Sequence, residues 1–142
     1  MATTRNATTH WEGSLTEGAG QVTLQSSGIG TYDVSWAARS EEANGKTSPE
    51  ELIAAAHTSC FSMALSGALA KAGTPPTALD TSAEVDFVPG TGITEIRLTV
   101  RGVVDGMSND DFVAAAEGAK VNCPVSQALA AVPSITLDAA LA

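Results

Sequence analysis

Basic residues are scarce in this chain of 142 residues: seven Lys and Arg stand against 16 Asp and Glu, which gives a formal net charge of −9. A protein this acidic offers no cationic surface to a phosphate backbone, and an anionic bilayer would repel it. We therefore expect neither nucleic acid nor membrane among its partners. The mean hydropathy is positive, at +0.10, which argues against a disordered chain.

Long uninterrupted apolar runs are also missing. The longest stretch of low charge, residues 52–70, is broken by one histidine and four Ser or Thr side chains. We interpret it as a buried helix that is too polar to span a bilayer. Residues 1–9 carry one cation and no apolar run, unlike a secretory signal. These features predict one soluble, cytoplasmic domain over residues 1–142.

Cysteine occurs only twice, at Cys60 and Cys123. Because the cytosol is reducing, a purely structural disulfide is disfavoured there. The pair is then either two inert thiols or a catalytic or redox-sensing couple.

Turn residues and alternating polarity divide the chain into a simple order of elements. A three-stranded antiparallel meander is predicted over about residues 10–36, and a long helix over residues 48–72. Strands near residues 83–87 and 95–101 follow, then helices over 109–120 and 124–132 and a last strand over 134–141. The order βββ-α-ββ-α-α-β indicates an α+β fold and not a doubly wound parallel one.

The long helix has a clear beginning and end in the sequence. Ser48 is the expected N-cap, Pro49 takes the first helical position, and Glu51 completes a capping box. Gly73 and the prolines that follow it end the helix. At about 24 residues it spans roughly 35 Å, so we expect it to be the central element.

Each cysteine allows a structural and a chemical interpretation. Cys60 lies within the long helix, where most cysteines are small buried hydrophobic residues. Cys123 directly precedes Pro124. If Pro124 opens a helix, Cys123 is its N-cap, where backbone N–H groups favour a thiolate. A cap cysteine can equally be structural.

A reactive thiol at neutral pH needs a nearby cation in so acidic a chain. Free cysteine has a pKa of about 8.5, so a thiolate requires a shift of roughly two units, or about 2.7 kcal/mol. Arg39 is the candidate, at the expected end of a strand and facing opposite to Trp36. The alternative is a surface arginine paired with Glu41 or Glu42, and the sequence favours neither.

Two strings carry a family resemblance: SPEELIAAAHTSCFSMALS at residues 48–66 and VNCPVSQAL at residues 121–129. They resemble the two cysteine motifs of the OsmC/Ohr family, the osmotically inducible and organic hydroperoxide resistance proteins. The similarity covers essentially the whole chain in element order and length. The Asn-Gly-Lys-Thr loop at residues 44–47 and Arg39 favour the OsmC branch.

The resemblance implies a thiol-dependent peroxidase that reduces organic hydroperoxides to alcohols, and hydrogen peroxide more weakly. By this resemblance Cys60 is the peroxidatic cysteine, Cys123 the resolving one, Arg39 the cation that stabilises the thiolate, and Glu50 the carboxylate that orients Arg39. A Cys60 sulfenic acid would condense with Cys123, and a dithiol reductant would reopen the disulfide. No cofactor or metal is implied. The family fold packs antiparallel sheets around a long central helix in an intertwined homodimer.

The position of Glu50 raises a geometric question. It precedes Cys60 by ten residues, which in a straight helix is about 15 Å of rise. Either the helix breaks near His57, or Glu50 acts in the site of the other subunit. His57 itself, one turn before Cys60, is either a base for that thiol or a packed helical histidine.

Two other classes of function are consistent with the same residues. One is a redox sensor whose Cys60–Cys123 disulfide switches a partner, although the chain has no interaction module. The other is a metal-binding protein that uses His57, Cys60 and Cys123, although these lack a Cys-x-x-Cys spacing.

Apolar side chains near Cys60 predict the substrate preference. Helical spacing places Ala56, Met63 and Ala64 near the thiol, where they could contact the alkyl group of an organic hydroperoxide. The same small residues could instead pack against a neighbouring helix, with no pocket.

Overall fold

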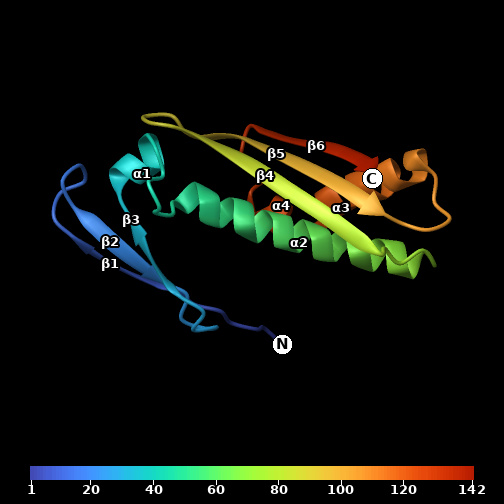
Figure 1. Ribbon diagram of the computed structural model, residues 1–142, viewed down its shortest axis with the longest axis horizontal. Helices are drawn as coiled ribbons and strands as arrows, with labels where there is room; N and C mark the ends of the chain where they lie inside the picture. The colour runs from blue at the N-terminus through green and yellow to red at the C-terminus, as the bar shows by residue number, and fades with distance from the viewer. The chain divides into compact units, whose positions relative to one another are not determined.

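The computed structural model describes all 142 residues, Met1–Ala142. The chain forms two compact units, Met1–Leu52 and Ile53–Ala142. Each unit contains one three-stranded sheet, β1-β2-β3 in the first and β4-β5-β6 in the second (Figure 1).

The first unit is the expected antiparallel meander. Its elements are β1 (Thr8–Glu12), β2 (Ala19–Thr23), β3 (Thr31–Val34), a short helix α1 (Trp36–Ser40) and the first residues of α2 (Pro49–Lys71). Among its apolar side chains only Val22 is buried, whereas Trp11, Leu15, Ile29 and Tyr32 are exposed. The meander therefore has almost no hydrophobic core of its own.

The segment around Arg39 differs from the sequence prediction. β3 ends at Val34, and Trp36 and Arg39 lie on α1 instead of at a strand end. The cause is a helix start that the alternating pattern concealed. Ser35 is the N-cap, and its hydroxyl accepts a hydrogen bond from the Ala38 N–H over 3.1 Å.

Helix α2 agrees with the prediction to within one residue at each end. The Ser48 hydroxyl accepts from the Glu51 N–H over 3.1 Å, as an N-cap does. The Glu51 carboxylate, however, accepts from the Thr47 hydroxyl over 2.6 Å, so the second half of the expected capping box is replaced. Gly73 stops the helix with a φ of +90°, a conformation that favours glycine.

The second unit adds a sheet and two helices to α2. Its elements are β4 (Ala78–Val88), β5 (Gly92–Val103), α3 (Asn109–Asn122), α4 (Pro124–Ala128) and β6 (Ser134–Leu141). β4 and β5 form the expected antiparallel hairpin, but β6 pairs with β5 in parallel. The α+β prediction is confirmed, and one pairing, that of β6 with β5, differs from the antiparallel sheets that the resemblance implied. The reason is that α3 and α4 form a crossover between β5 and β6.

The core of the second unit lies between the inner face of its sheet and the helices. β5 contributes alternate residues to it, and α2 and α3 contribute a stripe each: Ile96, Leu98, Val100, Phe61, Leu65, Leu69, Phe112 and Ala116. Gly102 continues the inward side of β5. A Cβ there would lie 2.5 Å from the Phe112 ring, so the close approach requires glycine.

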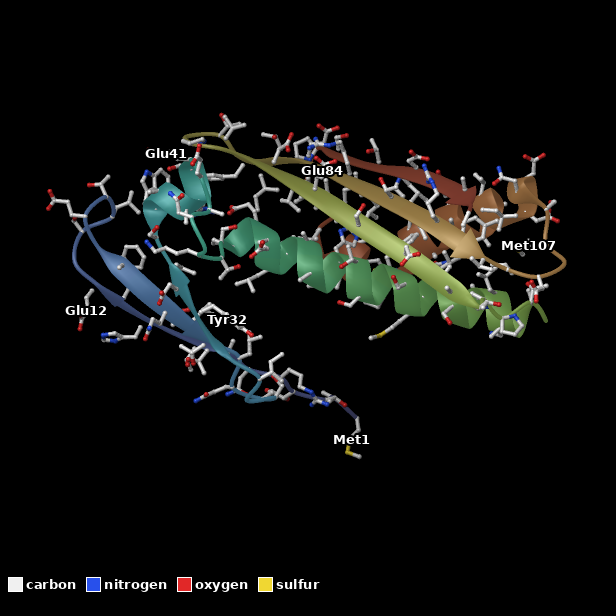
Figure 2. All side chains as sticks on the ribbon, viewed as in Figure 1. Met1, Glu12, Tyr32, Glu41, Glu84 and Met107 are labelled. Carbon is white, nitrogen blue, oxygen red and sulfur yellow. The ribbon has the colours of Figure 1, made fainter.

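The outer face of this sheet carries the ion pairs of Arg97 and Arg101. Arg97 binds Asp86 through two nitrogens, at 2.9 and 2.7 Å, and also Glu95 at 2.7 Å. Arg101 binds Asp138 at 3.1 Å. Glu84 lies on the same face, 3.6 Å from Arg97 (Figure 2). Both arginines of this unit are thus bound by carboxylates.

Helix α2 also requires a correction on hydropathy. By length and composition alone it is long and apolar enough to cross a membrane, contrary to the expectation that its hydroxyl groups make it too polar. A single such helix is weak evidence, because the core helix of a soluble protein meets the same criterion. Its inner face, with Phe61, Leu65 and Leu69, is buried in the core.

Candidate active site

The two cysteines meet inside the Ile53–Ala142 unit. Cys60 lies on α2, Cys123 lies between α3 and α4, and their sulfur atoms are 2.9 Å apart, with Cys123 Sγ donating to Cys60 Sγ. Both are free thiols, and Cys123 is fully buried while Cys60 is partly exposed. The fold therefore brings together two thiols 63 residues apart in the chain and leaves only Cys60 accessible.

Pro124 determines the position of Cys123 at the start of α4. Pro124 is the first residue of α4 and Cys123 is its N-cap, as the sequence predicts. The thiol forms no capping hydrogen bond of its own. Cys60 lies on α2, which is helical throughout from Pro49 to Lys71, so the suggested break near His57 is absent.

Local contacts make the two thiols unequal in acidity. Burial raises the pKa of Cys60, and its hydrogen bond with Cys123 raises it further, against a lowering by the Val125 backbone N–H. At Cys123 burial also opposes ionisation. The contact with Cys60, the backbone N–H groups of Ser126 and Val125 and the Ser126 hydroxyl outweigh burial and lower the pKa of Cys123. Within this unit no charged side chain stabilises a Cys60 thiolate.

His57 is fully buried and lies three residues before Cys60 on α2. Its Nε2 lies 2.6 Å from the hydroxyl of Ser126 on α4, and its Nδ1 has no partner. Burial lowers the pKa of His57, which favours the neutral ring. Because Nε2 pairs with Ser126 and Nδ1 with nothing, neither nitrogen is hydrogen-bonded to Cys60. The histidine is thus not placed as a base for that thiol.

The other two predicted residues, Arg39 and Glu50, meet in the Met1–Leu52 unit. Nε and one terminal nitrogen of Arg39 both lie 2.9 Å from Glu50 Oε1. The Glu50 side chain is 8% exposed and that of Arg39 32%, so the pair is largely desolvated. Arg39 therefore forms a largely buried ion pair with Glu50. The second carboxylate oxygen, Oε2, is buried without a hydrogen bond.

An apolar cavity of about 270 Å³ lies beside Arg39 in the same unit. Its walls include Trp11, Leu15, Trp36 and Leu52. Trp11 and Leu15 are among the exposed large apolar side chains of the chain. The cavity therefore combines an apolar lining with one guanidinium group.

The apolar residues that helical spacing placed near Cys60 do not enclose its thiol within the Ile53–Ala142 unit. Met63 is 73% exposed and Ala56 is exposed. Ala64 packs against the hydrophobic core.

Sequence reasoning missed Ser126 as a site residue. The available signal was its position three residues after a cap cysteine, because the third helical residue faces the N-cap. No group of three or more His, Cys, Asp or Glu side chains is arranged to hold a metal ion.

Comparison with known proteins gives a consistent result. Residues 41–138 match the OsmC-like protein family. The chain is 43% identical over 132 residues to Peroxiredoxin OsmC from Escherichia coli (strain K12), covering 91% of this chain and 90% of that protein, and it is equally similar to the Shigella flexneri protein of that name.

Solved structures show the same fold. An organic hydroperoxide resistance protein OsmC from Legionella pneumophila superposes with a TM-score of 0.74 at 23% identity, over 99% of this chain and 98% of that one. An organic hydroperoxide resistance protein from Elizabethkingia anophelis gives a TM-score of 0.73 at 21% identity, over 100% of both chains.

Proposed function

The chain belongs to the OsmC family of cysteine-based peroxidases, and on that premise we propose that it reduces organic hydroperoxides to alcohols through Cys60 and Cys123. The observation that supports this most directly is the 2.9 Å contact between the sulfur atoms of the only two cysteines. The accessibility of the two thiols supports the roles proposed for them. The partly exposed Cys60 meets the peroxide, and the buried Cys123 resolves the oxidised product.

The proposed reaction has three steps. The Cys60 thiolate attacks the distal peroxide oxygen, the O–O bond breaks, and the alkoxide takes a proton to leave as an alcohol. Cys123 then attacks the Cys60 sulfenic acid, which forms the disulfide and releases water. A dithiol reductant restores both thiols through a mixed disulfide.

Arg39 supplies the cation in this proposal. The Ile53–Ala142 unit has four cationic side chains, of which Arg97 and Arg101 are bound by carboxylates on the outer face of the sheet. None of the four lowers the pKa of Cys60. A guanidinium fixed by Glu50 would stabilise the thiolate and bind the polar peroxide oxygens.

We propose that Arg39 and Glu50 act on Cys60 of a second copy, in a homodimer that makes residues 1–142 one functional domain. Ten residues of unbroken helix separate Glu50 from Cys60, a rise of about 15 Å. The Met1–Leu52 unit also buries only one apolar side chain, and such a meander needs a further surface against its exposed residues.

The apolar cavity beside Arg39 supports a preference for organic over inorganic peroxide. With the peroxide group at Arg39, an alkyl tail could enter the space lined by Trp11 and Leu15. At about 0.8 kcal/mol per buried CH₂, four carbons contribute roughly 3 kcal/mol, which is about a hundredfold in kcat/KM if the contact is made in the transition state. Hydrogen peroxide has no alkyl group to bury there.

The reaction needs a reducing compartment to restore the thiols, and we propose the cytoplasm.

A complementation assay tests the shared site. Arg39→Ala supplies intact thiols and Cys60→Ser supplies an intact guanidinium, and neither variant alone should consume cumene hydroperoxide efficiently with a dithiol. If the site is shared, the co-refolded mixture should regain activity from one complete site in each mixed dimer. No recovery in mixed dimers verified by mass spectrometry would place Arg39 and Cys60 in one chain. Failure of the wild type to turn over would contradict the proposed peroxidase activity and would favour the alternative of a redox sensor.

A further inference from the structure

Buried His57 has no task in the peroxide chemistry proposed above. Its Nε2 lies 2.6 Å from Ser126 Oγ, a contact that joins α2 to α4 where both side chains are buried. The Ser126 hydroxyl helps to lower the pKa of the Cys123 thiol, and Cys123 Sγ lies 2.9 Å from Cys60 Sγ. The four side chains form a continuous chain of contacts that ends at the peroxidatic sulfur.

The unpaired Nδ1 of His57 suggests the direction of these hydrogen bonds. If Nδ1 carried the proton, a buried N–H donor would be left unsatisfied, and such groups are rare in folded proteins. With the proton on Nε2, the ring donates to Ser126 Oγ. The Ser126 hydroxyl is then directed to donate to Cys123. The Cys123 thiol donates to Cys60, so all the hydrogen bonds run the same way.

We propose that His57 and Ser126 are positioning residues for the resolving step. His57 fixes the Ser126 hydroxyl, and that hydroxyl stabilises the charge on Cys123 as it attacks the Cys60 sulfenic acid. This inference rests on the proposed roles of the two cysteines. It assigns the pair to disulfide formation and not to peroxide reduction, because neither side chain is hydrogen-bonded to Cys60.

The step balances without another reactant. The Cys123 sulfur forms a bond to the Cys60 sulfur as the Cys60 S–O bond breaks. The departing hydroxide takes the proton that Cys123 loses and leaves as water. The Cys123 sulfur is oxidised from the thiol to the disulfide level and the Cys60 sulfur is reduced from the sulfenic acid to the disulfide level, so no external oxidant or reductant is needed. The Ser126 hydroxyl keeps its own proton and only donates a hydrogen bond.

The surroundings of these four side chains favour a hydroxyl as the group that stabilises the charge on Cys123. No charged side chain contributes to the pKa shift of His57 or of either cysteine. The groups that face Cys123 are the Cys60 thiol, the Ser126 hydroxyl and the backbone N–H groups of Val125 and Ser126. A hydrogen bond to a charged group is stronger than one between neutral partners, so removing the hydroxyl withdraws a substantial part of the stabilisation of the thiolate.

Single-turnover kinetics separates the two steps. The reduced full-length enzyme is mixed with one equivalent of cumene hydroperoxide, and loss of peroxide and formation of disulfide are followed separately. For Ser126→Ala we expect peroxide consumption at the wild-type rate and disulfide formation about tenfold slower, which corresponds to about 1.4 kcal/mol. Sulfenic acid should accumulate, and trapping with dimedone measures it. Ser126→Thr, which keeps the hydroxyl, should resolve at close to the wild-type rate.

Two further variants distinguish positioning from packing. His57→Gln keeps a side-chain N–H donor and should resolve faster than His57→Leu, which has none. Ser62→Ala is the matched control, because it removes another short hydrogen bond from α2, the 2.8 Å contact with Thr81. It should leave disulfide formation unchanged.

A titration gives a readout that a loss of packing alone would not change. In the Cys60→Ser background, the absorbance of the Cys123 thiolate should titrate about one pH unit higher once Ser126→Ala is added. An unchanged titration together with resolution at the wild-type rate would overturn the inference. If Cys60 of the wild type forms no sulfenic acid at all, the proposed peroxidase fails instead, and the two failures are distinguishable.

Discussion

The two units of this chain divide the requirements of a thiol peroxidase between them. The Ile53–Ala142 unit has a continuous hydrophobic core and both thiols, but its two arginines are bound by carboxylates on the far side of the sheet. The Met1–Leu52 unit has a desolvated Arg39–Glu50 pair and an apolar cavity, but no thiol and one buried apolar residue.

The difference lies in how each unit uses its apolar residues. The second unit is a packed scaffold that fixes two sulfur atoms, and its sequence is constrained by the core. The first unit carries the Arg39–Glu50 ion pair and apolar side chains that stay exposed within the unit. In the proposed homodimer, the first unit acts on a thiol of the second copy, and that copy covers its exposed apolar surface.

The largest effect should come from breaking the thiol pair of the second unit. Cys60→Ser should abolish hydroperoxide consumption, because no other thiol is accessible. Cys123→Ser should react once and stop as a sulfenic acid. Mass spectrometry after one equivalent of peroxide distinguishes the two products. Normal turnover of Cys123→Ser with a dithiol would contradict the resolving role.

The next largest effect should come from removing the cation of the first unit. Arg39→Ala should raise the Cys60 pKa towards that of free cysteine, a change of roughly two units, and lower kcat/KM at pH 7 about a hundredfold. Thiolate absorbance measured against pH in the Cys123→Ser background checks this. Arg101→Ala, which breaks the exposed pair with Asp138, is the control and should titrate unchanged.

The cavity of the first unit predicts a smaller effect, on selectivity. The wild type should prefer cumene hydroperoxide to hydrogen peroxide by about one to two orders of magnitude in kcat/KM. Leu15→Ala should reduce that ratio severalfold without changing the rate with hydrogen peroxide. Ile29→Ala removes an exposed apolar side chain outside the cavity and should keep the ratio. Equal values for both peroxides in the wild type would mean that the cavity binds no substrate.

The smallest effect concerns stability and tests whether the second unit keeps His57 neutral. Burial lowers the pKa of His57 below its ordinary 6.5, so the unfolded chain binds the proton more readily than the folded one. The free energy of unfolding should therefore fall as the pH falls below about 6.5. His57→Gln should remove that component, a difference of about 2–4 °C in Tm between pH 7 and pH 5. His10→Gln, at the exposed histidine, should keep the wild-type profile.

Most of the scaffold could be predicted from the sequence, because local signals determine it. Ser48, Pro49 and Gly73 mark the ends of α2, and Pro124 opens α4, as the structure shows. The direction of β6 could not be predicted in this way. Its alternation gives a strand but not its pairing partner, and pairing is a long-range property.

The candidate site was predictable in its members but not in all its contacts. The four residues implied by resemblance occupy two real contacts, one within each unit. The Ser126–His57 contact escaped the sequence reasoning because it joins residues 69 positions apart, and an ordinary serine gives no compositional signal. α1 was missed because Ser35 reads equally well as the polar position of a strand and as an N-cap.

The parallel return of β6 also has a consequence for synthesis. The last strand ends at Leu141, and it closes the crossover that carries Cys123. A ribosome that has translated α2 has already produced Cys60, yet Cys123 is translated 63 residues later and the strand that closes its crossover later still. A nascent or truncated polypeptide therefore carries Cys60 without a stable resolving partner, so any oxidant that it meets can take that sulfur past the sulfenic acid to forms that do not return.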